Sequence, residues 1–166
     1  RDAVELFFNT YKDSIPSFPT TAKIRHLLVD VEPGMEQVNK TINLLNEIRL
    51  KILNNEETFA DMAVKYSQDP SAKQAGGSLG FVKRGTLVTE FETVAFNLKP
   101  GEVSEPVKTD FGYHIIETEE IRGDKINVRH ILITPPTTET DESRAYKKAQ
   151  ALKDSSTTLE QFVKNV

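Results

Sequence analysis

Apolar residues recur every three or four positions along the segment that follows Pro33-Gly34. This spacing places them on one face of a helix, and the pattern stops at Asn54-Asn55. We therefore expect one long amphipathic helix, whose apolar face carries Met35, Val38, Ile42, Leu45, Ile48 and Ile52.

The same periodicity predicts three shorter helices. The first covers residues 2–12, where the chain is apolar and compatible with a helix. The second begins at Thr58, because Thr58 and Asp61 have the spacing of a capping box. The third covers residues 89–98 and ends before Pro100-Gly101.

Alternating or continuous apolar runs predict strands at residues 22–29, 79–82, 103–107 and 113–121. Two prolines break the helical pattern at residues 14–19, and the glycines of residues 67–80 favour a loop. This order of elements is typical of an α+β fold. We expect a small mixed or antiparallel four-stranded sheet flanked by about four helices.

The chain contains a partial internal repeat. Residues 126–133 copy the pattern of residues 22–29, with His130 in the place of His26, and residues 159–162 resemble the approach to Phe59. The second copy stops before its glycine loop. Because roughly 40 residues rarely hold a core alone, we interpret residues 122–166 as a linker and the truncated start of a second domain.

Composition narrows the class of protein. The chain has 166 residues, of which 37% are hydrophobic and 28% charged, and its net charge is -4. These values are ordinary for a globular domain and argue against a nucleic-acid surface, which needs a basic patch. There is no cysteine, so thiol nucleophiles, thiolate metal sites and disulfides are excluded. No apolar run approaches the ~20 residues that span a bilayer, so the protein is not expected to be membrane-embedded.

The three histidines all lie in strand-like motifs. His26 and His130 stand in R-H-[LI]-L segments, and His114 stands in G-Y-H-I-I. This leaves no further histidine for a Ser-His-Asp triad, and neither an H-E-x-x-H motif nor a phosphate-binding loop is present. We therefore expect neither a hydrolase nor a metalloenzyme, and no cofactor.

Several segments, in their order and spacing, resemble the parvulin family of peptidyl-prolyl isomerases between residues 22 and 121. They are R-H-L-L (25–28), S-Q-D-P-S-A-K-Q-A-G-G-S-L-G-F (67–81), R-G-T-L-V-T-E-F-E (84–92) and L-K-P-G-E-V-S-E-P-V-K-T-D-F-G-Y-H-I-I (98–116). The flanking helix, linker and second R-H-I-L copy resemble the SurA/PrsA class of extracytoplasmic folding factors, in which SurA-like proteins join a chaperone module to two parvulin domains.

The resemblance implies the positions of an active cleft. His26 and His114 match the paired central histidines, Asp69 the cysteine-or-aspartate position, and Thr109 a threonine that completes the polar network. Apolar residues that match the proline pocket and its rim are Leu79, Leu87, Phe91 and Phe111. Each group also has a purely structural interpretation, since histidines in apolar strands are often hydrogen-bonded core residues and the apolar residues could simply form core.

Two functions remain open from the sequence. The first is a non-covalent peptidyl-prolyl isomerase, which favours the twisted state of a bond whose rotational barrier is ~18–20 kcal/mol. The acidic residues after Val29 make selectivity for phosphorylated sites unexpected. The second is a catalytically weak or silent module that binds peptides as a chaperone. Both functions imply unfolded or extended proline-containing polypeptides as partners.

The resemblance also implies a domain plan and a location. Residues 1–21 are expected to end an N-terminal chaperone module and to form a linker, residues 22–121 to form a complete parvulin domain, and residues 122–166 to begin a second one. Such a chain would be cut from a longer bacterial protein that is periplasmic or otherwise extracytoplasmic and assists secreted or outer-membrane proteins.

Overall fold

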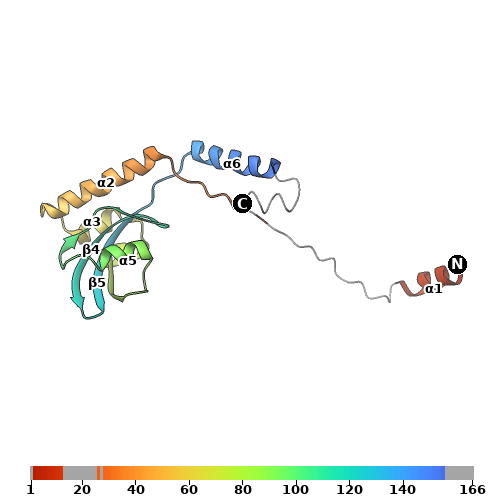
Figure 1. The fold of residues 1–166 in the computed structure, drawn as a ribbon, viewed down its shortest axis with the longest axis horizontal. Coiled ribbons are helices and arrows are strands. Elements are labelled where there is room, and N and C mark those ends of the chain that lie inside the picture. Colours follow the sequence, from red (N-terminus) through yellow and green to blue (C-terminus); the bar gives the residue numbers. More distant parts are fainter. Residues whose placement is uncertain (1, 13–25, 27, 156–166) are drawn as a thin grey trace.

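The computed structural model describes residues 2–12, 26 and 28–155, which form an α+β fold (Figure 1). Its helices are α1 (Asp2–Tyr11), α2 (Met35–Leu53), α3 (Phe59–Tyr66), α4 (Pro70–Ala75), α5 (Thr89–Ala95) and α6 (Glu139–Asp154). Its strands are β1 (Ser78–Lys83), β2 (Glu102–Val103), β3 (Val107–Thr109), β4 (Gly112–Arg122) and β5 (Lys125–Ile133). The predicted fold class is confirmed. None of the helices in these ranges is long and apolar enough to cross a bilayer.

The sheet has five antiparallel strands in the order β1-β5-β4-β2, and β3 also pairs with β4. One strand more than expected arises because residues 102–109 form two short strands. Pro106 lies between them and has no N–H to donate to a ladder, so the strand expected at residues 103–107 is divided there.

The helices expected from periodicity are present with small changes at their ends. The Thr58 hydroxyl accepts a hydrogen bond from the Asp61 N–H at 3.1 Å, as the capping spacing predicts. The expectation of an uninterrupted loop at residues 67–80 is wrong, because residues 70–75 form α4. Pro70 is its first residue, a position where the missing N–H costs nothing.

The sheet carries an apolar core on each face, because successive side chains of a strand point to opposite sides. On one face α2 and α3 pack against the strands with Leu45, Ile48, Phe59, Met62, Ala63, Val103, Ile115, Ile131 and Ile133. On the other face α5 packs with Phe91, Ala95, Leu98, Ile116, Ile126 and Val128. The long central strands β4 and β5 therefore contribute to both cores.

The central strand position, which we define as the place between β1 and β4, is filled by β5. A strand of this sheet was expected from residues 22–29, and for the described part of that segment this expectation is wrong. His26 is exposed, Leu28 is 77% exposed, and residues 26, 28 and 29 form no strand. Residues 22–25 and 27 lie outside the described residues, as does the repeat at residues 159–162.

A tight hairpin explains why β5 takes this position. Arg122 pairs with Lys125, so β4 and β5 are joined by the two residues Gly123 and Asp124. Gly123 has φ +59°, a value that suits two-residue hairpin turns and costs glycine little. The first strand of the second copy therefore lies in the same sheet as the elements of the first.

Candidate active site

Two histidines lie side by side on the sheet face that α5 covers. His114 on β4 points to the same face of the sheet as Ile116, two residues further along. His130 on β5 points to the same face as Val128. Their rings are nearly parallel, with centroids 5.4 Å apart and an interplanar angle of 16°. The two Nδ1 atoms are 3.3 Å apart, and both side chains are buried.

A chain of hydrogen bonds runs through this pair. Thr109 Oγ1 lies 2.8 Å from His114 Nε2, the Nδ1 atoms of the two histidines meet, and His130 Nε2 lies 2.7 Å from Asp69 Oδ2. An ionised carboxylate only accepts, so His130 Nε2–H donates to Asp69. When both imidazoles are neutral, His130 Nδ1 accepts from His114 Nδ1–H, and His114 Nε2 accepts from the Thr109 hydroxyl.

The direction of this chain requires both imidazoles to be neutral, and their surroundings favour that state. The pKa of His114 is lowered from 6.5 to about 4, chiefly by burial and also by the neighbouring His130, while Asp69 opposes the change. Burial also lowers the pKa of His130, although the hydrogen bond and negative charge of Asp69 oppose this. Near pH 7 both imidazoles are therefore uncharged beside the Asp69 carboxylate.

The backbone beside β5 holds Asp69 in place. The Gln68 N–H donates to the Leu132 carbonyl at 2.8 Å, and Ser67 Oγ accepts from the N–H groups of Leu132 and Asp69 at 3.2 and 3.3 Å. On the other side, the His130 N–H donates to the Gly77 carbonyl at 2.9 Å. The loop that carries Asp69 and the strand that carries His130 are thus joined by several bonds.

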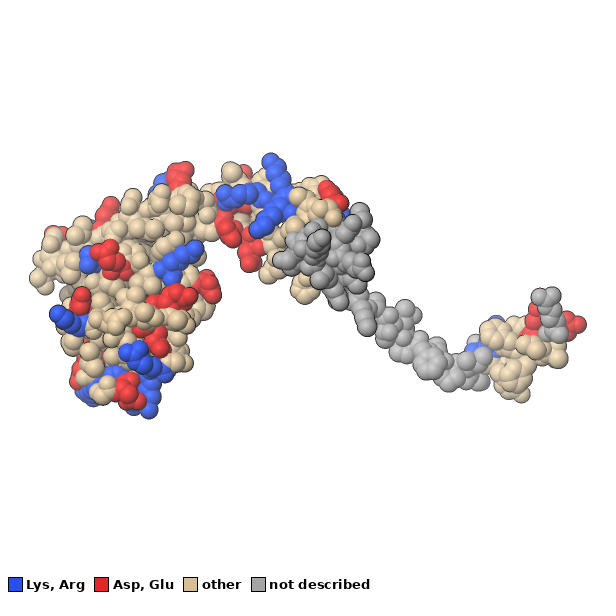
Figure 2. Space-filling view, in the orientation of Figure 1, with Lys and Arg blue, Asp and Glu red and all other residues tan. Residues whose placement is uncertain are grey.

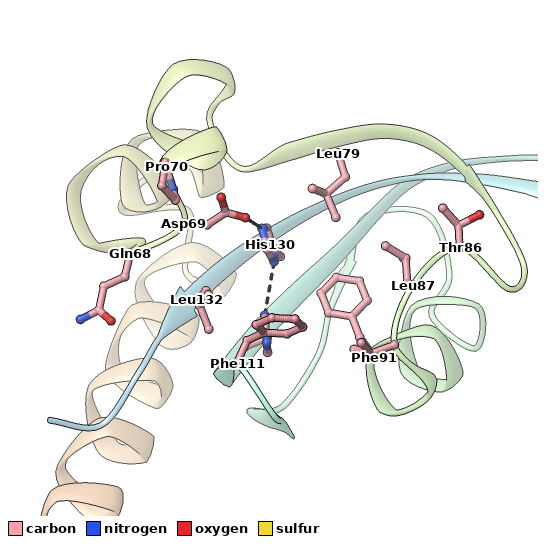
Figure 3. Close-up of a pocket in the computed structure, with 12 residues that line it drawn as sticks. Gln68, Asp69, Pro70, Leu79, Thr86, Leu87, Phe91, Phe111, His130 and Leu132 are labelled. Carbon is pink, nitrogen blue, oxygen red and sulfur yellow. Dashed lines mark hydrogen bonds and ion pairs between the residues drawn. The ribbon is translucent and has the colours of Figure 1, made fainter. Parts of the chain in front are cut away.

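An open cavity of about 550 Å³ lies against this chain and is lined mainly by apolar side chains (Figure 3). Phe91 forms its floor and contacts both imidazoles edge-on, with centroid distances of 5.4 Å to His114 and 5.6 Å to His130. Leu79 and Leu87 also line it, while Phe111, which is 61% exposed, stands at its edge. The remaining lining residues are Gln68, Pro70, Thr86, Val88 and Leu132.

The structure brings together all but one of the site residues expected from the sequence. Asp69, Leu79, Leu87, Phe91, Phe111 and His114 line the cavity, and Thr109 bonds to His114 from behind. His26 does not line it; the place expected for His26 is taken by His130. The internal repeat, which aligns these two histidines, is the signal that could have identified His130. Ser67 and Gln68 had no such signal, because they act through backbone bonds.

Comparison with known proteins identifies the family of this domain. The family model described as "Rotamase: PPIC-type PPIASE domain" matches residues 26–120. The chain belongs to this family of parvulin domains. The family is described as a PPIase domain, so this match supports a peptidyl-prolyl cis-trans isomerase.

The relatives are folding factors from bacteria. The chain is 50% identical over 114 residues to foldase protein PrsA of Geobacillus kaustophilus, covering 69% of this chain and 34% of the relative. It is 45% identical over 103 residues to chaperone SurA of Cupriavidus pinatubonensis, covering 62% and 20%. A solved structure of the peptidylprolyl isomerase PrsA from Bacillus cereus is 36% identical, covers 66% of this chain and 38% of that one, and has a TM-score of 0.46. The chain thus spans roughly a fifth to a third of these curated relatives.

The limits of the family match bear directly on the histidine pair. Residues 26–120 include His26, Asp69, Thr109 and His114 but end before β5. His130, which completes the hydrogen-bonded chain, therefore comes from outside the matched parvulin domain. His26 and the described residues that follow it, 28–34, do not line the cavity.

Proposed function

We propose that this parvulin domain catalyses cis-trans isomerisation of X-Pro bonds in unfolded or extended polypeptides, without a covalent intermediate. The observation that carries this proposal is the juxtaposition of an apolar cavity with the Thr109–His114–His130–Asp69 chain. An X-Pro segment offers matching chemistry, because its ring is apolar and its carbonyl is polar. The absence of cysteine from the sequence removes the thiol route to a covalent adduct.

The apolar side chains account for how a substrate would be held. Leu79, Leu87 and Phe91 surround a space that suits a proline ring, and holding the ring fixes one side of the rotating bond. Removal of water from the amide disfavours its polar planar form relative to the twisted state. Binding energy spent in this way lowers the rotational barrier of ~18–20 kcal/mol.

The hydrogen-bonded residues beside the cavity account for how the charge on the substrate carbonyl oxygen would be stabilised. In the twisted state the amide loses its resonance, so the charge on the carbonyl oxygen changes as it moves. Asp69, beside the cavity, and the neutral histidine pair set a fixed electrostatic environment for that movement. A preoriented site needs no rearrangement during the rotation.

The charge of the cavity bears on substrate choice. Among the lining residues that the structure describes there is no lysine or arginine, whereas Asp69 is acidic. A phosphate group on the residue before proline would meet a carboxylate rather than a cation. We therefore propose that the site acts on unphosphorylated sequences.

For the whole protein we propose a role in the folding of exported polypeptides, in the periplasm or in another extracytoplasmic space, and with outer-membrane proteins among its substrates. The names of the matched relatives, chaperone SurA and foldase PrsA, support this role.

The test measures isomerisation of an X-Pro tetrapeptide by exchange NMR or a protease-coupled assay. We expect the wild-type chain to accelerate the exchange and Asp69→Ala to reduce kcat/KM by roughly tenfold or more, because a fixed charge beside the carbonyl is lost. Phe91→Ala should weaken substrate binding, because it opens the floor of the cavity.

Two control variants change similar residues outside the cavity. Phe81→Ala removes an exposed aromatic ring of β1, and Glu56→Gln removes an exposed carboxylate; both should retain wild-type kcat/KM. Circular dichroism checks that each variant is folded. If the wild type gives no acceleration over buffer, the isomerase proposal fails, and peptide binding without turnover would then favour the chaperone module.

A further inference from the structure

One wall of the cavity is carried by a short loop rather than by a helix or a strand. Residues 84–88, which we call the 84–88 loop, connect β1 to α5 and contribute Thr86, Leu87 and Val88 to the lining. In Figure 3 Leu87 lies beside the ring of Phe91, and it packs against the apolar cluster that contains this ring. The space between Leu87 and Phe91 therefore depends on where the loop is held.

The 84–88 loop is fastened to the helix that follows it at two points. The Gly85 N–H donates a hydrogen bond to Glu92 Oε2 at 2.6 Å. The Arg84 guanidinium lies over the Phe96 ring, with Cζ 4.2 Å from the ring centroid. Glu92 and Phe96 are four residues apart, so their side chains lie on the same side of the helix. Two neighbouring residues of the loop thus rest on one face of α5.

The bond to Glu92 is the stronger polar attachment of the loop. An ionised carboxylate forms a shorter and stronger hydrogen bond with an N–H group than a neutral acceptor does. The other backbone bond of this turn, from the Thr86 N–H to the Lys83 carbonyl, is longer at 3.3 Å. Gly85 has φ +82°, and a Cβ there would meet no atom within 4 Å, so no side-chain packing holds the turn at this residue.

We propose that Glu92 is a positioning residue that sets the specificity of the cavity for the five-membered ring of proline. Its carboxylate keeps the 84–88 loop against α5 and so keeps Leu87 at a fixed distance from Phe91. Glu92 does not line the cavity, so it acts through Leu87 and not by contact with a substrate. This inference rests on the proposed function, because it assigns the width of the proline-binding space to one residue outside that space.

A second carboxylate on the same helix provides a matched control. Glu92 lies in the first turns of α5, where a negative charge is favourable for the helix itself. Glu90 lies there as well, but its side chain is exposed and its carboxylate forms no hydrogen bond in the part of the chain that the structure describes. Glu90→Ala therefore removes a helix-stabilising charge and leaves the attachment of the loop intact.

The first experiment compares an X-Pro peptide with a peptide in which pipecolic acid, whose ring has one more methylene group, replaces proline. We expect Glu92→Ala to raise KM for the proline peptide about threefold to tenfold with little change in kcat, because one wall of the binding space is loosened. The preference in kcat/KM for proline over pipecolic acid should fall by a similar factor, since a looser wall admits the larger ring.

Two further variants separate the hydrogen bond from the charge. Glu92→Gln keeps an acceptor oxygen and should restore most of the KM and of the preference for proline, while Glu90→Ala should match the wild type. Circular dichroism checks that each variant is folded. Wild-type KM and wild-type preference in Glu92→Ala would overturn the proposal. A Glu92→Gln variant that behaves like Glu92→Ala would overturn it too, since the role assigned is that of an acceptor.

The second experiment measures the position of the loop without turnover, by NMR of the peptide-free chain. We expect Glu92→Ala to accelerate exchange of the Gly85 amide proton about threefold to tenfold, because its acceptor is lost. The methyl signals of Leu87 should shift as this side chain moves relative to the Phe91 ring. Glu90→Ala should change neither observable. Unchanged exchange and unchanged methyl signals in Glu92→Ala would refute the attachment itself.

These readouts distinguish failure of this inference from failure of the proposed function. If the wild type binds both peptides without accelerating isomerisation, the proposed function fails. The ratio of the two dissociation constants then takes the place of kcat/KM. A ratio that falls in Glu92→Ala and is restored in Glu92→Gln supports the positioning role, and a ratio equal to that of the wild type in both variants refutes it.

Discussion

At the scale of single residues, the site depends on the fixed direction of one hydrogen-bonded chain. Thr109 Oγ1 accepts from the Phe111 N–H at 3.1 Å and, with both imidazoles neutral, donates its hydroxyl proton to His114 Nε2. Every later donor is then determined, as far as the carboxylate of Asp69. The motifs allowed His114, Asp69 and Thr109 to be predicted, but the choice between His26 and His130 depends on which strand is present.

The histidine pair makes folding stability depend on pH. The folded-state pKa of His114, about 4, lies below its ordinary value of 6.5, so the unfolded chain binds more protons between these values. The stabilisation is fully present above pH 6.5 and is lost as the pH falls to 4. For His114 alone the loss amounts to roughly 3 kcal/mol.

This loss is measured by urea unfolding of the wild type and of His114→Asn between pH 7.5 and 4. The variant should show a flatter decline in the free energy of unfolding, because the titrating group is gone. Thr109→Val is the matched control, since it removes a neighbour of His114 but keeps the imidazole, and its decline should stay steep. Parallel curves for wild type and His114→Asn would contradict the assigned burial.

At the scale of elements, β1 approaches β5 so closely that one position between α4 and β1 requires glycine. Gly77 has φ +83°, and a Cβ there would lie 2.6 Å from the His130 carbonyl oxygen and 3.0 Å from Ala63 Cβ. The helices were predictable because their apolar period is long, whereas α4 was not, because six residues beginning with proline and followed by glycines resemble a loop. The central strand was not predictable, because two segments carry the same pattern and only packing distinguishes them.

The close approach of β5 at Gly77 predicts that a side chain at this position lowers the free energy of unfolding. Gly77→Ala should lower the free energy of unfolding by about 1–3 kcal/mol more than Gly80→Ala does. Both glycines have positive φ, so both variants bear the backbone penalty of about 1–2 kcal/mol. Gly80 has no atom within 4 Å of the added carbon, so the difference isolates the contact with β5. Equal midpoints in urea would show that the strands separate easily at this point.

At the scale of the whole molecule, the sheet separates structural support from the candidate site. The core under α2 and α3 lies on one face, while the cavity and α5 lie on the other. Charged side chains of both signs are scattered over the face shown in Figure 2. The α+β class follows from the order of periodic segments, but the two-sided packing follows from the register of β4 and β5, which the sequence alone leaves undetermined.

This separation predicts that changes in the core under α2 and α3 lower folding stability without lowering activity. Leu45→Ala, at a fully buried position of α2, should cost about 2–5 kcal/mol of unfolding free energy. The isomerisation rate per folded molecule should remain near that of the wild type. Leu50→Ala on the same helix, where the side chain is 55% exposed, is the control and should change stability by less than about 0.5 kcal/mol. A large fall in kcat for folded Leu45→Ala would show that the faces are coupled.

The two-residue connection between β4 and β5 has a consequence for how firmly His130 is kept beside His114. Lengthening that connection by a few flexible residues would raise the entropic cost of bringing β5 to β4, but each doubling of loop length costs only about 0.6 kcal/mol. Insertions at Gly123-Asp124 should therefore weaken the hairpin gradually, whereas the loss of one buried apolar side chain of β5 should weaken it abruptly.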